Sequence, residues 1–115
     1  MSTDCIFCKI IKGELKAKFV YENDKVVVIE DINPQAPVHI LIIPRKHIAT
    51  PMEIEDNDKD ILSAVFQAAR HVAKERKIDS SGFRTVLNCM EGAGQSVFHI
   101  HFHLLGGRQM QWPPG

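Results

Sequence analysis

The stretch SVFHIHFHLLGGR (residues 96–108) places His99, His101 and His103 at alternate positions, although the chain has only six histidines in 115 residues. Successive side chains of a β-strand point to opposite faces, so these three share one face and the apolar residues between them share the other. The apolar face is suited to a core, whereas the histidine face must meet something polar. Residues 97–105 are therefore predicted to form a strand that carries a functional site on one side.

The sequence before this stretch predicts one short helix, three strands and one long helix. Residues 5–12 have the apolar spacing of a short amphipathic helix that ends near Gly13. Residues 17–23 and 25–31 are rich in β-branched and aromatic side chains and predict a tight hairpin. Residues 37–44 are apolar nearly throughout and predict a central strand. Residues 57–77 show helical periodicity, with acidic residues at the start and basic residues at the end, as the helix dipole favours.

Residues 83–88 and 97–105 predict two further strands, joined by the loop 89–96. The order of the elements predicts a single α+β domain over residues 1–115, with a five-stranded antiparallel sheet and the helices packed on one side of it.

The composition excludes several classes of partner and location. Fourteen basic and fourteen acidic residues cancel, so no net field favours a nucleic acid or a membrane surface. The amino terminus lacks the basic and apolar regions of a signal peptide, and no apolar run is long enough to span a bilayer. Three cysteines, an odd number, argue for a reducing compartment rather than a disulfide framework. We therefore expect a cytoplasmic protein.

The histidine row suggests chemistry on phosphorus rather than a three-histidine metal site. Alternate strand residues stand about 6.7 Å apart at Cα, so one zinc ion with Zn–N distances of about 2.0–2.1 Å takes two neighbours easily but hardly three. Imidazole is partly neutral near pH 7 and is itself a nucleophile. The alternative is a sheet face whose histidines are only hydrogen-bonded or solvated.

The loop EGAGQS (residues 91–96) supplies a second hint of phosphate binding. Gly92 and Gly94 permit the positive φ angles that point successive N–H groups into an anion-binding nest, and Ser96 adds a hydroxyl. Taken alone, such a loop is more often a simple turn. Beside the histidines it predicts half of a phosphate site.

The pair Cys5-x-x-Cys8 can chelate one zinc ion. The alternative is two small side chains on one face of a helix. Two other residues are given no functional role: His71 falls on the polar face of the long helix and is expected to be solvated, and Cys89 is expected to be apolar filling.

The chain resembles the histidine triad (HIT) family. HIHFHLL matches the family signature of three histidines alternating with apolar residues. The segments IFCKIIKGE, DINPQAPVHILIIPRKHI and GQSVFHIHFHLLGGRQMQWPPG resemble the Hint branch over essentially the whole chain. The resemblance implies a homodimer in which two five-stranded sheets join into a ten-stranded one. It also implies an adenosine 5′-monophosphoramidase-like hydrolase, without an organic cofactor, that acts on purine nucleoside phosphoramidates and aminoacyl-adenylates.

The resemblance also implies roles for individual residues. His101 would attack the α-phosphorus to form a nucleotidyl-histidine, while a protonated His103 and Ser96 bind the phosphate oxygens. Asn33 stands where relatives often have serine, and Trp112 belongs to a tail that crosses to the partner subunit. The implied catalytic set is His39, His99, His101 and His103. The implied nucleotide-binding set is Phe7, Ile10, Ile29, Asp31, Asn33, Asn88, Gln95, Ser96 and Trp112.

For the metal, the resemblance adds His47 and His99 to Cys5 and Cys8, a closed Cys₂His₂ set for a structural zinc ion. Two readings of function remain beside the phosphoramidase. One is a non-catalytic nucleotide-binding scaffold for signalling proteins. The other is a different HIT branch, which hydrolyses dinucleoside polyphosphates or removes adenylate from DNA ends.

Overall fold

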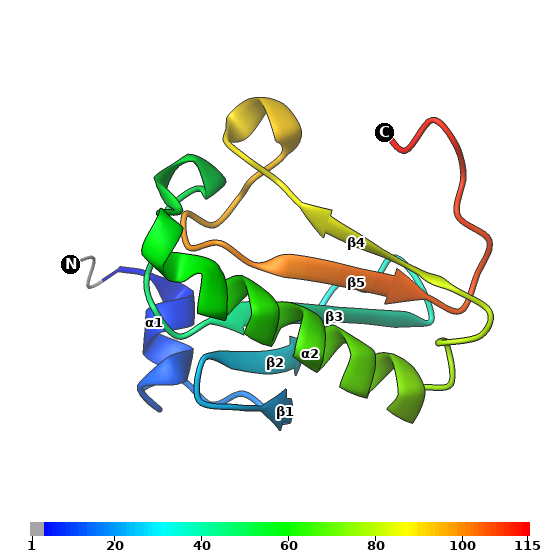
Figure 1. Ribbon diagram of the computed structural model, residues 1–115, viewed down its shortest axis with the longest axis horizontal. Helices are drawn as coiled ribbons and strands as arrows, with labels where there is room; N and C mark the ends of the chain where they lie inside the picture. The colour runs from blue at the N-terminus through cyan, green and yellow to red at the C-terminus, as the bar shows by residue number, and fades with distance from the viewer. Residues whose placement is uncertain (1–3) are drawn as a thin grey trace.

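The computed structural model describes residues 4–115, which form a five-stranded antiparallel sheet in the order β1-β2-β3-β5-β4 (Figure 1). This confirms the α+β fold predicted from the sequence. Short 3₁₀ turns occupy Pro51–Glu53, Asp56–Asp58 and Glu91–Ala93. The main elements are α1 (Ile6–Ile11), β1 (Phe19–Glu22), β2 (Val26–Glu30), β3 (Val38–Pro44), α2 (Lys59–Glu75), β4 (Phe83–Leu87) and β5 (Phe102–Gly106).

The hairpin between β1 and β2 forms where the sequence places it. The Asn23 side-chain oxygen accepts hydrogen bonds from the backbone N–H groups of Lys25 and Val26, both at 2.9 Å. An asparagine that bonds to the backbone two and three residues ahead closes a tight turn without help from the rest of the fold. The turn therefore sets the pairing of β1 with β2 locally.

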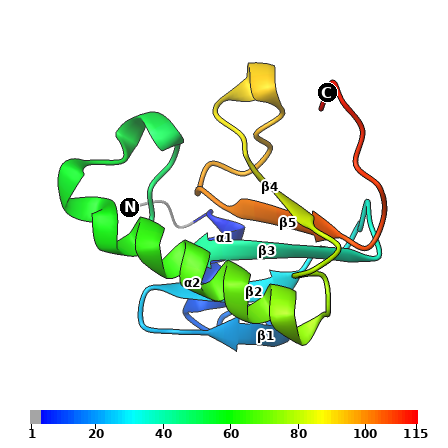
Figure 2. The ribbon, with the colours of Figure 1, turned by 45° about the vertical axis from the view of Figure 1, so that its right-hand side comes forward.

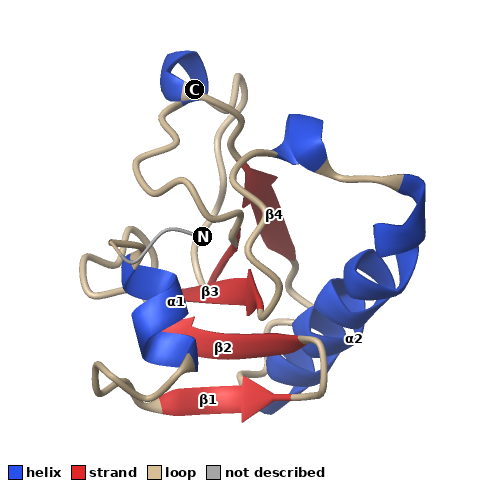
Figure 3. Ribbon diagram, turned by 90° about the vertical axis from the view of Figure 1, so that its left-hand side faces the viewer, coloured by secondary structure: helices blue, strands red, loops and turns tan. Residues whose placement is uncertain are grey.

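The two helices cover opposite faces of the sheet, which corrects the expectation that both pack on one side (Figures 2 and 3). Val26 and Val28 of β2 belong to the core under α2, whereas Val27 and Ile29 pack with α1. Every residue of β3 is buried. A strand that is apolar nearly throughout, with His39 as the exception here, is one whose two faces are both covered, and the run 37–44 carried that information. No helix within residues 4–115 is long and apolar enough to cross a membrane.

Strand β5 is shorter than predicted, because it begins at Phe102 and leaves His99 and His101 in the irregular segment before it. Phe102, the first residue of β5, pairs with Ile42 of β3 on one side and with Leu87 of β4 on the other. Beyond these partners β4 ends and β3 closes on Pro44, which has no N–H to donate. The segment is held instead by the Ile100 N–H, which donates to the Ile48 carbonyl oxygen at 2.8 Å.

The alternation of faces nevertheless continues through the segment. Ile100, Phe102 and Leu104 lie in the core under α2, and the histidines between them turn toward α1. The ladder sets Leu41 of β3 opposite His103 and His39 opposite Leu105. The functional side chains of the middle strands thus gather on the α1 face.

Replacement of Ile42 by Ala tests the two-faced core. Ile42 is fully buried beneath α2, so its truncation should lower the free energy of unfolding by about 2–5 kcal/mol. The matched control is Ile32→Ala, because Ile32 is fully exposed and its truncation should change stability by less than about 0.5 kcal/mol. Urea unfolding followed by circular dichroism measures both. Equal effects of the two substitutions would contradict the described core.

Candidate functional site

A cavity of about 300 Å³ opens on the α1 face of the sheet, between α1, the end of β2 and the histidine segment. Seven of the residues predicted for the site line it: Phe7, Ile10, Ile29, Asp31, Ser96, His101 and His103. Five lining residues were missed from the sequence: Ile6, Glu30, Ile32, Leu41 and Val97. Two of these, Ile6 and Leu41, could have been predicted, because Ile6 has helical spacing to Ile10 and Leu41 lies in a predicted strand. Residues in loops have no such periodicity.

His101 is fixed by its own backbone. Its Nδ1–H donates to the carbonyl oxygen of His99 at 2.8 Å, and a carbonyl can only accept. This partner assigns the tautomer, so that Nε2 carries the lone pair. The ring is 7% exposed and meets Phe7 edge-on, with ring centroids 5.0 Å apart. His101 therefore brings an oriented ring to the cavity, and in its neutral form the lone pair is on Nε2.

His103 and His39 form a hydrogen-bonded pair whose direction is set by a backbone amide. The Gln35 N–H donates to His39 Nδ1 at 3.0 Å, so His39 carries its proton on Nε2 and donates it to His103 Nδ1 at 2.9 Å. His103 is then left with a proton on its own Nε2. Asp31 stands close to the pair, with Oδ2 3.4 Å from His39 Nε2. His39 does not line the cavity, and it acts on the site through His103.

The expectation of a protonated His103 is wrong for the free protein. Burial lowers the pKa of His103 to about 4, and repulsion by neighbouring His101 and His39 when they carry a proton adds to the effect. Asp31 opposes the shift only in part. Near pH 7 His103 is therefore a neutral donor through Nε2–H rather than a cation.

The glycine loop does not form the predicted anion nest. The backbone N–H groups of Ala93, Gly94 and Gln95 all donate to carbonyls within the loop, at 2.9–3.2 Å. Gly94 has a positive φ of 88°, but the other residue of the loop with a positive φ is Met90 rather than Gly92. Only Ser96 of this loop faces the cavity, and within residues 4–115 its hydroxyl and N–H have no hydrogen-bond partner.

The resemblance implies that the backbone near Gln95 assists phosphate binding, but the Gln95 N–H already donates to the Met90 carbonyl oxygen at 3.1 Å. The Gln95 side chain holds the loop in place. It is 5% exposed, accepts from Met90 N–H at 2.8 Å, and donates to the carbonyls of Ala49 at 2.7 Å and Val97 at 3.1 Å. These bonds tie the loop 89–96 to the segment that follows His47. Gln95 thus fixes the position of the neighbouring Ser96 without itself lining the cavity.

Besides Gln95, three predicted nucleotide-binding residues do not line the cavity. Asn33 is exposed, and its N–H donates to Asp31 Oδ1 at 2.8 Å, which holds the carboxylate in place. Asn88 is half-buried just after β4. Trp112 is 81% exposed on the carboxyl-terminal tail. Their contacts with a nucleotide stay predictions.

Cys5, Cys8, His47 and His99 converge into a cluster whose ligand atoms all lie within 4.8 Å of one another. His99 Nδ1 stands 3.3 Å from Cys5 Sγ, 3.6 Å from Cys8 Sγ and 3.1 Å from His47 Nδ1, and Cys8 Sγ is 3.3 Å from His47 Nδ1. Tetrahedral zinc with Zn–S of about 2.3 Å and Zn–N of about 2.0–2.1 Å places its ligand atoms about 3.3–3.8 Å apart. The spacing of this cluster fits a zinc ion.

The protonation of the cluster fits a metal as well. His99 donates its Nε2–H to the Pro44 carbonyl oxygen at 2.7 Å, which leaves the Nδ1 lone pair for the cluster. Burial lowers the pKa of His99, and this also favours the unprotonated ring. Burial and the neighbouring Cys5 raise the pKa of the Cys8 thiol, and a bound dication would act in the opposite direction.

Asp31, His39 and His103 form a second group with ligand-like spacing, but its protons do not suit a metal. The single lone pair of neutral His39 already accepts from the Gln35 N–H. His39 Nε2 consequently carries a proton where a metal ligand needs a lone pair. This group is a hydrogen-bond relay, and the cysteine-containing group is the candidate metal centre.

Two residues given no functional role lie apart from both groups. His71 is exposed on α2, as expected, and its ring also stacks on Tyr21 with centroids 4.3 Å apart. Cys89 is half-buried and is a free thiol.

Comparisons with known proteins agree with the fold. A family model described as the HIT domain matches residues 12–110. A 14 kDa zinc-binding protein of Brassica juncea is 49% identical over 114 residues, which cover 97% of this chain and all of that protein. The crystal structure of a HIT family hydrolase from Legionella pneumophila has a TM-score of 0.94 and 48% identity over 97% of this chain and 100% of that one. A HIT family hydrolase from Clostridium thermocellum has a TM-score of 0.92 and 49% identity, with 96% of each chain covered.

Two imidazoles, of His101 and His103, line one cavity on an antiparallel sheet, and the fold is that of solved proteins named HIT family hydrolases. The span of the family match and the relatives that cover nearly the whole chain show which family it is: the chain belongs to the HIT family.

The lowered pKa of His103 predicts a pH-dependent stability. The unfolded chain takes up the His103 proton near pH 6.5, and the folded protein takes it up only near pH 4. Between these values the unfolded state binds more protons, so the free energy of unfolding should fall as the pH is lowered from 6.5 to 4. The variant His103→Asn should show a shallower fall in urea unfolding at stepped pH. An identical pH profile for the two proteins would refute the assignment.

Proposed function

We propose that the protein hydrolyses purine nucleoside phosphoramidates, such as AMP joined to an amine, and aminoacyl-adenylates, through a nucleotidyl intermediate on His101. The observation that carries the proposal is the hydrogen bond from His101 Nδ1–H to the His99 carbonyl oxygen, which leaves Nε2 as a nucleophile in the cavity. The solved HIT family relatives named hydrolases support the same reading at a coarser level.

The cavity supplies what such a displacement requires. Nε2 of His101 attacks the α-phosphorus, the P–N bond breaks, and the amine leaves after protonation. Water then attacks the phosphorus of the nucleotidyl-histidine and frees the ring. Charge that develops on the phosphoryl oxygens would meet the Nε2–H of His103 and the hydroxyl of Ser96, whose positions are set in advance by His39 and Gln95. Two easier steps replace one difficult step.

The rest of the cavity suits a nucleoside. Asp31, held by the Asn33 N–H, offers a carboxylate to the ribose hydroxyls. Phe7, Ile10 and Ile29 form an apolar wall for a purine, and no polar side chain among them would select one base. Discrimination between adenine and guanine is therefore expected to be weak.

Replacement of His101 by Ala should separate binding from turnover. We expect kcat on an AMP–amine conjugate to fall by about 10³-fold or more, because no other ring nitrogen with a free lone pair lines the described cavity. The Kd for AMP should change by less than about threefold. The matched control is His71→Ala, an exposed histidine on α2, which should leave both values unchanged.

Persistent turnover by the His101→Ala variant would refute the nucleophile. Comparison of the AMP–amine conjugate with a diadenosine polyphosphate separates this proposal from the other HIT branch. A protein that binds AMP but cleaves neither would be the non-catalytic scaffold.

We also propose that the Cys₂His₂ cluster holds one structural zinc ion. The ligand spacing and the printed name of the Brassica juncea relative support this assignment. The four ligands leave no open position, so the ion would join α1, the loop after β3 and the histidine segment without taking part in the reaction. Three free cysteines and a thiolate site are compatible with a reducing compartment, and we propose the cytoplasm.

Metal analysis tests the zinc site. The purified protein should contain about one zinc per chain, and the double variant Cys5→Ala/Cys8→Ala should contain less than about a tenth of this. Cys89→Ala removes a cysteine outside the cluster and should retain the zinc. Unchanged zinc content in the double variant would rule the site out.

A homodimer is proposed on the resemblance to the Hint branch. The outer edge of β4 is unpaired within residues 4–115 and carries the half-exposed Phe83. Arg84 of the same strand donates to the Gln111 carbonyl oxygen at 3.0 Å and so orients the tail that bears Trp112. Pairing of two β4 edges would build the ten-stranded sheet and bring each tail toward the partner subunit.

A further inference from the structure

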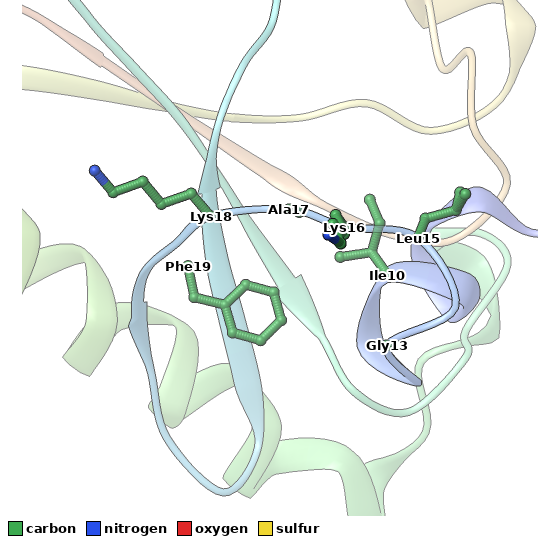
Figure 4. A pocket seen from close by; sticks show the side chains of 7 residues that line it. All are labelled: Ile10, Gly13, Leu15, Lys16, Ala17, Lys18 and Phe19. Atoms are coloured by element: carbon green, nitrogen blue, oxygen red, sulfur yellow. The ribbon is translucent and has the colours of Figure 1, made fainter.

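The cavity that contains His101 does not end at the apolar wall proposed for the nucleobase. A second hollow of about 430 Å³ shares five of its lining residues. It continues past Leu15 to Lys16 and Lys18, and a third hollow of about 530 Å³ lies between the end of α1 and the start of β1 (Figure 4). The shared wall consists of Ile6, Ile10, Ile29, Glu30 and Ile32. The second hollow thus adjoins the cavity of His101 on one side and is lined by the segment 15–18 on the other, and we call it the groove along α1.

The far wall of this groove is anchored to the helix. Gly13 has a positive φ of 81° and turns the chain back at the end of α1. The N–H groups of Glu14 and Leu15 then both donate to the Lys9 carbonyl oxygen, at 2.8 and 3.3 Å. In Figure 4 Leu15 and Lys16 lie beside Ile10, and Lys18 stands farther along the same extended stretch of chain with its side chain pointing away from them. The segment 13–18 is therefore a defined wall of the groove.

The lining of this hollow carries two ammonium groups, on Lys16 and Lys18, and one carboxylate, on Glu30, which is paired with Arg76 at 2.7 Å. Lys16 and Lys18 are exposed, and neither has an ion pair or a side-chain hydrogen bond with any residue from 4 to 115. The lysines that do pair elsewhere show the contrast, since Lys46 is bound to Asp58 at 2.7 Å. Two unpaired ammonium groups at the end of an apolar groove favour a ligand with a short apolar link and a terminal anion.

The orientation of the nucleotide follows from the proposed function, on which this inference rests. The phosphate lies at His101 and His103, the ribose at Asp31, and the base against Ile10 and Ile29. Because Ile10 and Ile29 line both hollows, and because the six-membered ring is the part of a purine farthest from the sugar, the outer edge of that ring would point toward the second hollow. A substituent on that edge would enter the groove and reach the lysines.

We propose that the groove beyond the nucleobase wall is a subsite for an anionic substituent on the six-membered ring of the purine. The preferred substrates are then base-modified purine nucleotides that carry a carboxylate on the C6 amino group or at C2. The apolar residues Leu15 and Ile32 take the linking carbons, and Lys16 and Lys18 bind the carboxylate.

Matched pairs of AMP derivatives test the subsite by binding alone, since none contains a bond that the protein would cleave. One pair carries a carboxymethyl or a carbamoylmethyl group on the C6 amino group, and the other carries the same two groups at C2. Calorimetry at low ionic strength should give, for at least one pair, a Kd about three- to tenfold lower for the carboxylate than for the amide. This ratio should approach one at about 0.5 M salt.

Variants locate the effect. Lys16→Gln/Lys18→Gln should bring the carboxylate-to-amide ratio close to one, whereas Lys74→Gln, on α2 across the sheet, should retain the preference. Equal Kd values for both pairs in the unmodified protein would overturn the proposal. So would a preference that survives in the double variant, or a loss of affinity of more than tenfold relative to AMP for every substituted nucleotide.

The outcome is separable from that of the proposed function. A carboxylate preference without cleavage of AMP–amine conjugates would leave the subsite standing and refute the hydrolase. Cleavage of AMP–amine conjugates without any carboxylate preference would support the hydrolase and refute the subsite.

Discussion

Two hydrogen bonds of His99 connect the candidate metal centre to the candidate catalytic centre, and the site depends on them. The ring donates Nε2–H to the Pro44 carbonyl oxygen, which turns the Nδ1 lone pair toward Cys5, Cys8 and His47. The carbonyl oxygen of the same residue accepts from His101 Nδ1–H, which turns the other nitrogen of His101 into the cavity. One fully buried residue thus belongs to the candidate metal centre and orients His101 in the candidate catalytic centre.

A chain of hydrogen bonds also sets the orientation and the tautomer of His103. Its hydrogen atoms are placed by a chain that starts at a backbone amide, because the Gln35 N–H can only donate. His39 and His103 take the only tautomers compatible with this donor, and the chain ends with a donor at the cavity. The same constraint distinguishes the two groups of metal-ligating residues. Spacing alone would allow a metal ion at both groups. The proton on His39 Nε2 excludes an ion from the group of Asp31, His39 and His103, which leaves the group that contains the cysteines.

Much of this arrangement was predictable from local patterns in the sequence. The alternation of residues 96–108 predicted which histidines face away from the core, and the runs 17–23 and 25–31 predicted the hairpin that Asn23 closes. The glycines of the loop 89–96 were misleading, because conformational freedom does not say where the N–H groups point, and here they close on the carbonyls of Met90 and Glu91. The sequence alone could not predict that His103 is neutral. This neutrality depends on burial beside His39 and His101, and these contacts exist only in the folded chain.

Capture of the covalent intermediate tests the account most directly. Rapid acid or base quenching of the protein during turnover of an AMP–amine conjugate, followed by proteolysis and mass spectrometry, would locate any attached nucleotide. The account predicts an adenylyl group on His101, linked through Nε2, in the peptide that contains residues 96–108. An adduct on His103, His99 or Ser96, or turnover with no adduct on any residue while the bond is being cleaved, would contradict it.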